Sequence, residues 1–493
     1  MSRTRIVKGK ITEITGGTLR IYGNRIIINS GGRIDFFAPK YTYGDPGEPP
    51  VSKFAEFDIK FELDTTEETI VPFGLLDFEN KAENQFFKFK YTLEKSDIDE
   101  FYLDIISENG DYLYTHNCLK PAIIDNEYKE PLFKTEKTSQ IPMNSVLIPE
   151  GSPDFEPKDY TAMGTYIISW DGFDKNGIYD STRFNNKNLK AKITAIKNGR
   201  RKSIVVDFST KYDQVEWTDV KIDKNTKRID VTLRVNLTDG GAEGLSCWNN
   251  TRNFNPPHSK SEICDWDKIP EDKIDPSKPV IKARSKSFSD LEKLAIEGLN
   301  YHWGRNKNHF IAKNVIMNNE SYEFYMNAIN TNKKAIGAIE LIYNTNNNWM
   351  RSGNPGSIKD PMTAIGNVIS RQAICYNVGY IYYLDWYEFY KSKNWSYRLE
   401  TNEEIDFKFT SAHEIGHEIL KKFEGTIYSY GHKGSVNSVT QNMKNDAPEY
   451  PIDSEIDIMP YYPQSPRPPL FKNYAAAEKD VLGLIWLTKI EIR

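Results

Sequence analysis

The sequence is short of cysteine and histidine, and it has no long apolar run. Its 4 cysteines in 493 residues are too few for a disulfide scaffold and fit synthesis in a reducing compartment. No apolar run approaches the length of a membrane span. Acidic residues slightly outnumber basic ones, which gives a net charge of −5. We therefore expect no disulfide scaffold, no membrane span, and neither nucleic acid nor an anionic membrane as a partner.

The N-terminus lacks the pattern of a secretion signal. Residues 1–17 carry early basic residues but no apolar segment, so we expect no Sec signal. The chain is then made in the cytoplasm and, if it acts elsewhere, leaves by another route. Its length predicts about three or four domains. The 39% hydrophobic content is enough for several buried cores.

The first half of the chain is predicted to be β-rich. Short β segments separated by glycines over 1–50 favour a small β module. Apolar and polar residues alternate from Phe57 onward, which predicts antiparallel strands with one exposed face, and they alternate again over Ile229–Leu237, which predicts a further strand. We predict an antiparallel β domain at 51–130 and a β-sandwich at 131–250.

One turn in this region has a recognisable form. The phrase WDGFDKNG, from Trp170 to Gly177, resembles a turn of immunoglobulin-like domains in bacterial secreted and appendage proteins. The resemblance implies immunoglobulin-like modules in the β-rich part. We expect the Asp and Gly residues to shape the turn and not to bind an ion.

Residues 251–286 are predicted to be a linker, because Pro, Lys and Asp dominate them. Cys247, His258 and Cys264 lie at or near this stretch, but their spacing fits no zinc knuckle. Whether the two cysteines pair stays open. Residues 287–493 change to mixed helical and strand patterns, and we predict an α+β domain there.

The residues with recognisable chemistry are concentrated in Ser411–Gly425, which holds two of the seven histidines. Read as a helix, this stretch places His413 and His417 one turn apart on one face, with Glu414 beside them. This is the HExxH arrangement, in which two imidazoles bind zinc and a carboxylate acts as general base.

The helix is predicted independently of that motif. An apolar stripe runs along one side, with Thr410 or Ser411 as the N-cap and Gly425 as the stop. The stripe consists of Ala412, Ile415, Gly416, Ile419, Leu420 and Phe423.

A catalytic zinc ion needs a third protein ligand and an open position for water. The first choice is His432, because glycines on both sides allow the backbone to turn it toward the metal. The alternative is an acidic residue from later in the chain. Glu478 is the main candidate of that kind, followed by Glu455 and Asp457.

The residues quoted above resemble a known family. Met459 with Tyr461 two positions later resembles the Met-turn of metzincins, and residues 287–493 resemble zincin metallopeptidases. The nearest type is metzincin-like with a lengthened loop, because the close-spaced third histidine is absent. The resemblance implies Zn²⁺ held by His413, His417 and His432, Glu414 as general base, Tyr461 as a hydrogen-bond donor to the oxyanion, and a protein or peptide substrate.

The whole layout also resembles bacterial toxin effectors that contractile injection machines of the type VI kind deliver. They combine β-rich front modules with a C-terminal hydrolase and lack a Sec signal. The resemblance implies that residues 1–50 dock on a spike or tube component, that the target lies inside another cell, and that the producer makes an immunity protein.

Two other functions stay open from the sequence. One is a structural or adhesive β protein whose zinc only stabilises the last domain. The other is a zinc hydrolase that cleaves peptide cross-links of the cell wall.

Overall fold

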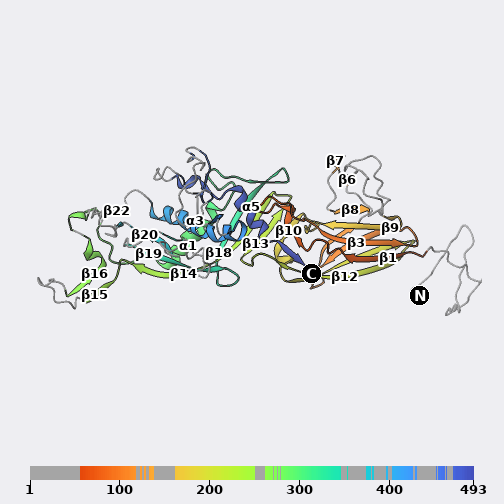
Figure 1. Cartoon of the computed structure of the whole chain (residues 1–493), viewed down its shortest axis with the longest axis horizontal. Helices are drawn as coiled ribbons and strands as arrows, with labels where there is room; N and C mark the ends of the chain where they lie inside the picture. The colour runs from red at the N-terminus through yellow and green to blue at the C-terminus, as the bar shows by residue number, and fades with distance from the viewer. Residues whose placement is uncertain are drawn as a thin grey trace, which may run out of the picture. The chain divides into compact units, whose positions relative to one another are not determined.

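The computed structural model describes residues 56–117, 161–249, 261–345, 373–378, 402–425 and 470–493, apart from single positions near 275, together with short pieces such as 428–429, 433 and 454–460 (Figure 1). The chain divides into two compact units, Met1–Glu56 and Phe57–Arg493. The β module predicted at 1–50 lies outside the described residues, which belong to the second unit apart from Glu56.

The second unit is rich in β-strands, as the sequence predicts. Within the described residues it has three α-helices: α1 (Phe288–His302), α3 (Glu403–Phe423) and α5 (Glu478–Trp486). None of the helices in this part of the chain is long and apolar enough to cross a membrane.

Two antiparallel sheets are built mainly from strands before residue 213. The first contains, in order, β1 (Asp58–Leu63), β3 (Phe87–Glu94), β9 (Gly164–Trp170) and β8 (Phe133–Lys137). The second contains β2 (Thr69–Ile70), β25 (Ile490–Ile492), β12 (Arg200–Tyr212), β11 (Lys187–Lys197), β4 (Glu100–Ile106) and β5 (Tyr112–Asn117). Their buried faces meet through aromatic rings, because Phe89 contacts Phe208 with 5.8 Å between ring centroids and Tyr91 contacts Phe101 at 4.9 Å.

The third sheet is mixed and carries the helices. Its order is β10 (Ile178–Asp180), β13 (Thr218–Asp223), β14 (Arg228–Glu243), β18 (Glu320–Asn330) and β17 (Val315–Met317), with β19 (Ile336–Asn344) and β20 (Ile374–Asn377) continuing from the second half of β14. β14 pairs antiparallel with β13 and parallel with β18 and then β19. Its alternate side chains from Ile229 to Leu237 are buried, which confirms the predicted alternation.

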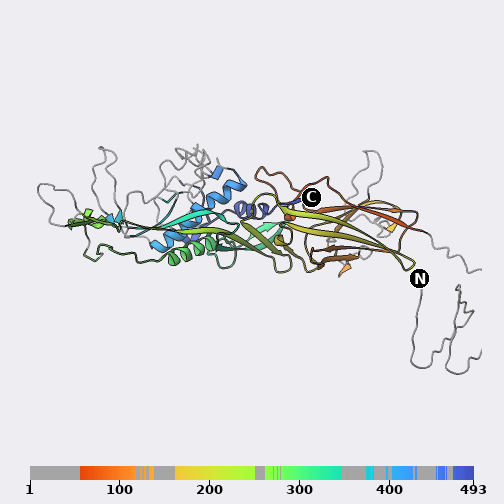
Figure 2. The ribbon, with the colours of Figure 1, turned by 90° about the horizontal axis from the view of Figure 1, so that it is seen from below.

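Helices α1 and α3 pack against each other and against this sheet, and Figure 2 shows both beside its strands. Ser287 caps α1, because its hydroxyl accepts from the Asp290 amide while the Asp290 carboxylate accepts from the Ser287 amide. The two helices pack closely at Gly298, where a Cβ atom would lie 2.1 Å from the Lys408 carbonyl oxygen. A side chain at this position would therefore push the two helices apart.

Strand pairing crosses the predicted domain boundaries. β4 pairs with β11, β14 pairs with β18 and β19, and the C-terminal β25 pairs with β12 and β2. The ranges 51–130, 131–250 and 287–493 therefore share sheets. Hydrophobic periodicity identifies a strand and its buried face, but it carries no information about which distant strand pairs with it.

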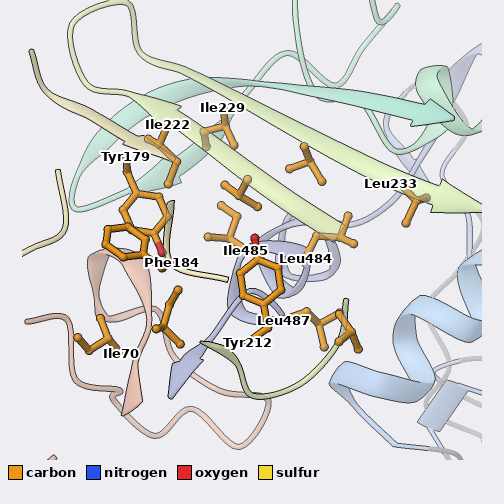
Figure 3. Packing of buried hydrophobic residues seen from close by; sticks show 14 of the residues in the cluster. Ile70, Tyr179, Phe184, Tyr212, Ile222, Ile229, Leu233, Leu484, Ile485 and Leu487 are labelled. Carbon is orange, nitrogen blue, oxygen red and sulfur yellow. The ribbon is translucent and has the colours of Figure 1, made fainter. Parts of the chain in front are cut away.

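The shared core includes helix α5 of the last range. Figure 3 shows Leu484 and Ile485 of α5 among side chains from earlier strands, including Tyr179 and Tyr212. At the end of this helix the Lys489 ammonium lies 2.9 Å from both carboxylate oxygens of Glu83.

Smaller strand pairs lie outside these sheets. They are β6 (Ile123–Ile124) with β7 (Glu127–Tyr128), β15 (Cys247–Asn249) with β16 (Glu262–Cys264), β21 (Tyr380–Ile381) with β22 (Ser396–Tyr397), and β23 (Ile456–Asp457) with β24 (Tyr474–Ala475). A disulfide joins Cys247 to Cys264 across β15 and β16. This bridge settles the pairing that the sequence leaves open and shows that the predicted linker contains ordered structure. His258 lies outside the described residues.

The turn after Trp170 has the structural role that the sequence predicts. Asp174 accepts hydrogen bonds from the backbone amides of Asn176 and Ile178, and it pairs with Arg183 at 3.0 Å. Asp171 pairs with Lys224 at 2.8 Å. Both carboxylates are therefore paired with groups of the protein itself, which fits a structural role in the turn.

Candidate metal site on helix α3

Helix α3 begins earlier than the sequence predicts. Asn402 is its N-cap, because the Asn402 Oδ1 accepts from the amides of Glu404 and Ile405 at 3.1 and 3.3 Å. Ser411 therefore lies inside the helix and is buried, so the prediction of a cap at Thr410 or Ser411 is wrong. The helix extends because Asn402 and the acidic first turn form a stronger start signal than an isolated Ser or Thr. Gly425 follows the end with φ +87°, as the prediction of a stop requires.

The predicted apolar stripe is confirmed and fixes how the helix faces the rest of the unit. All six of its residues are buried: Ala412, Ile415, Gly416, Ile419, Leu420 and Phe423. At Gly416 a Cβ atom would lie 2.7 Å from Met459 Sδ and 2.9 Å from the Trp303 ring. The glycine thus lets Met459 and Trp303 touch the helix backbone. Trp303 also donates from its indole nitrogen to the Ala412 carbonyl at 3.1 Å.

The two histidines of the motif lie together and are buried. His413 is 7% exposed and His417 is 2% exposed. Their ring centroids are 4.8 Å apart and the rings are nearly perpendicular, at 86°. Glu414, between them in the sequence, is half-buried on the same helix. The helix therefore brings both imidazoles into one small space, as the motif predicts.

A backbone carbonyl orients each histidine ring. His413 Nδ1–H donates to the Ile458 carbonyl at 2.7 Å, and His417 Nδ1–H donates to the Ser429 carbonyl at 3.0 Å. A carbonyl oxygen only accepts, so Nδ1 carries the hydrogen in both rings. In a neutral imidazole Nε2 then holds the lone pair. This is the tautomer of a histidine that binds a metal through Nε2 while its other nitrogen contacts an outer partner.

The segment predicted to be a Met-turn lies against α3. Ile456 and Asp457 form β23 and pair with β24, and the Ile458 amide donates to the Ala475 carbonyl at 3.0 Å. Met459 is fully buried and contacts Gly416, which lies between the two histidines on the helix. Tyr461 lies outside the described residues.

The acidic alternatives for the third ligand all make other interactions. Glu455 forms a bidentate pair with Arg305, at 2.5 and 2.9 Å. Asp457 lies 2.6 Å from the Lys433 ammonium. Glu478, at the start of α5, accepts a hydrogen bond from the Ile316 amide. His432, the first choice, lies outside the described residues.

Two further histidines, His302 and His309, have a packing role. His302 Nδ1–H and His309 Nε2–H both donate to the Tyr474 carbonyl, at 2.8 and 3.1 Å. Burial lowers the pKa of His302 to about 4 and lowers the pKa of His309 as well. Both rings are therefore neutral near pH 7 and support β24 beside the Met459 segment.

Sequence reasoning misses the residues that hold the site from outside. Arg305 is 7% exposed and, besides Glu455, donates to the Ala476 carbonyl at 2.8 Å. Lys433 binds two carboxylates, those of Asp457 and Asp480. No motif connects these partners, because they are far apart in the sequence and each is an ordinary charged residue when read alone.

Within the part of the chain that the structure describes, one group of three side chains has ligand atoms close together: Cys247, Glu262 and Cys264. Both sulfurs belong to the disulfide, so this group gives no evidence for zinc.

No protein-family model matches this chain, and no curated protein matches it.

Proposed function

We propose that this chain is a zinc-dependent peptidase whose metal site is built on helix α3. One observation carries the proposal: His413 and His417 are buried side by side, and a carbonyl holds the Nδ1 of each ring. In the tautomer that these carbonyls select, the Nε2 atom of each ring carries the lone pair, which is the form in which an imidazole binds a metal. The donor set therefore fits zinc, which favours imidazole nitrogen.

The proposed site is completed by His432, with Nε2 of His413 and His417 as the other protein ligands. Each acidic alternative already has another partner, which supports this choice. Glu455 is paired with Arg305, Asp457 with Lys433, and Glu478 with the Ile316 amide. For Glu455 and Asp457, leaving the ion pair would be costly, because the buried cation of Arg305 would lose its paired carboxylate and that of Lys433 would lose one of its two.

The proposed chemistry divides between the metal and the chain. Bound zinc supplies a Lewis acid that polarises the scissile carbonyl and acidifies water. The Glu414 carboxylate takes the proton of the attacking water and passes it to the nitrogen of the leaving amine. We assign Tyr461 the role of donating its hydroxyl hydrogen bond to the developing oxyanion.

We assign helices α1 and α3 on the mixed sheet to an α+β zincin-type arrangement, and the two antiparallel sheets to immunoglobulin-like β-sandwich modules. The packing of α1 on α3 and the ring contacts between the two sheets support this assignment.

We further propose that the chain is a bacterial toxin effector delivered by a contractile injection system. Its partners would be a spike or tube component, a protein or peptide substrate in the target cell, and an immunity protein in the producer. The Cys247–Cys264 disulfide supports a folded form that acts outside a reducing cytoplasm.

The test uses the purified full-length chain. We expect about one zinc ion per chain, and cleavage of casein or of a peptide library that a chelator abolishes and zinc restores. Glu414→Gln should keep the zinc and lose at least about 100-fold in turnover, because the general base is gone. Glu418→Gln, one helical turn further on α3, is the matched control and should keep turnover within about threefold.

The outcomes separate the possible functions. Full turnover by Glu414→Gln, or a chain without zinc, overturns the proposal. Zinc without hydrolysis of any substrate points to a structural or adhesive protein. Release of muropeptides without cleavage of casein points to a hydrolase of cell-wall cross-links.

A further inference from the structure

The two carbonyls that orient the histidines belong to different segments of the chain. Ser429, which accepts from His417, directly follows Tyr428, whose carbonyl accepts from the Lys433 amide at 3.4 Å. Ile458, which accepts from His413, lies in the segment 455–459. The relative position of the two rings therefore depends on how these two segments are held together.

The side chain of Lys433 makes that connection. Its ammonium lies 2.6 Å from Asp457 Oδ2 and also contacts Asp480 Oδ2 on helix α5. The other oxygen of Asp457 accepts from the Met459 amide at 3.1 Å. Lys433 thus joins three parts of the chain: its amide binds Tyr428, next to Ser429, and its ammonium binds the segment that contains Ile458 and helix α5.

This ion cluster is buried. The side chain of Lys433 is 8% exposed and that of Asp480 is 1% exposed. Charged hydrogen bonds away from water are stronger and more directional than those at the surface. The cluster can therefore hold the two segments in a fixed relation, which a solvent-exposed ion pair does poorly.

The backbone of Lys433 points to the same role. Its φ is +53°, in the left-handed region, where glycine is the usual residue. A lysine keeps this strained backbone conformation when contacts with its surroundings offset the strain. Here the surroundings are the two carboxylates that bind its side chain.

We propose that Lys433 is a positioning residue of the metal site, which aligns the two histidine supports through Asp457 and Asp480. This inference rests on the proposed zinc function. Positioning residues around metal ligands typically change metal affinity by about 10- to 100-fold when they are removed. Lys433 touches neither substrate nor metal in this role.

The test compares the zinc affinity of full-length variants by competition with a chelator. Lys433→Met should bind zinc about 10- to 100-fold more weakly, and Lys433→Arg should recover most of the loss, because it restores a cation between the carboxylates. Lys489→Met is the control, because Lys489 and Glu83 form another largely buried ion pair in the same compact unit. It should lower the unfolding midpoint but leave zinc affinity within about twofold of the wild type.

A second variant covers the case in which Lys433→Met does not fold. Asp457→Asn removes the ion pair to Lys433 while its Oδ1 can still accept from the Met459 amide. It should weaken zinc binding by about 10-fold or more. Folded variants at Lys433 and Asp457 that bind zinc as tightly as the wild type overturn this inference alone, whereas a wild-type chain without zinc overturns the proposed function as well.

Discussion

Residues 287–493 should not fold when they are expressed alone. Cutting the chain at residue 287 removes β14, which pairs with both β18 and β19 in the mixed sheet. It also leaves the C-terminal β25 without β12 and β2. The helix with the HExxH motif would then lose much of the sheet beneath it.

The magnitude follows from the burial of β14. Five of its side chains, from Ile229 to Leu237, are 0 to 3% exposed. Burying one such aliphatic side chain stabilises a fold by about 1.5 to 3 kcal/mol, so losing all five costs about 7 to 15 kcal/mol. The whole stability of a typical domain is about 5 to 15 kcal/mol. The fragment therefore retains little or no net stability.

The assay is urea unfolding followed by circular dichroism on two fragments. Residues 57–493, which form one compact unit, should unfold in a single cooperative transition, whereas 287–493 should show none. Leu233→Ala in the longer fragment should cost about 2 to 5 kcal/mol, and Val205→Ala, at an exposed site, less than about 0.5 kcal/mol. A cooperative transition and zinc binding by 287–493 would refute this reasoning.

Two further predictions concern the surroundings of the site. Gly416→Ala puts a carbon 2.7 Å from Met459 Sδ and should destabilise the fold by about 1 to 3 kcal/mol in urea unfolding. In the control Gly337→Ala no atom lies within 4 Å of the new carbon, so stability should change by less than about 0.5 kcal/mol. Equal effects of the two substitutions would contradict the close packing at Gly416. Burial lowers the pKa of His302 from 6.5 to about 4. Between these two pH values the unfolded chain binds a proton at His302 and the folded chain does not. The free energy of unfolding therefore falls as the pH is lowered through this range. His302→Asn, which can still donate to the Tyr474 carbonyl, should show a shallower fall, by up to about 1.4 kcal/mol per pH unit; identical slopes would show that this histidine is not buried as a neutral ring.

Sequence patterns were sufficient for features that depend on neighbouring residues. The alternation from Phe57 and from Ile229 identified strands and their buried faces, because side chains alternate across a strand. The apolar stripe of α3 and its stop at Gly425 followed from helical periodicity in the same way. The start of α3 also has a local signal, because Asn402 precedes three acidic residues in the first turn, although Thr410 and Ser411 are equally good N-cap residues by type.

The rest depended on contacts between distant residues. Composition suggests domain boundaries, but β14 and β25 complete sheets with strands far away in the sequence. The HExxH spacing by itself put His413 and His417 on one face of a helix. Only the tertiary structure assigned the Ile458 and Ser429 carbonyls to their rings and Lys433 to Asp457 and Asp480. The physical reason is that every residue has a carbonyl and most charged residues lie in solvent, so a sequence cannot mark which of them the fold will bury beside a histidine.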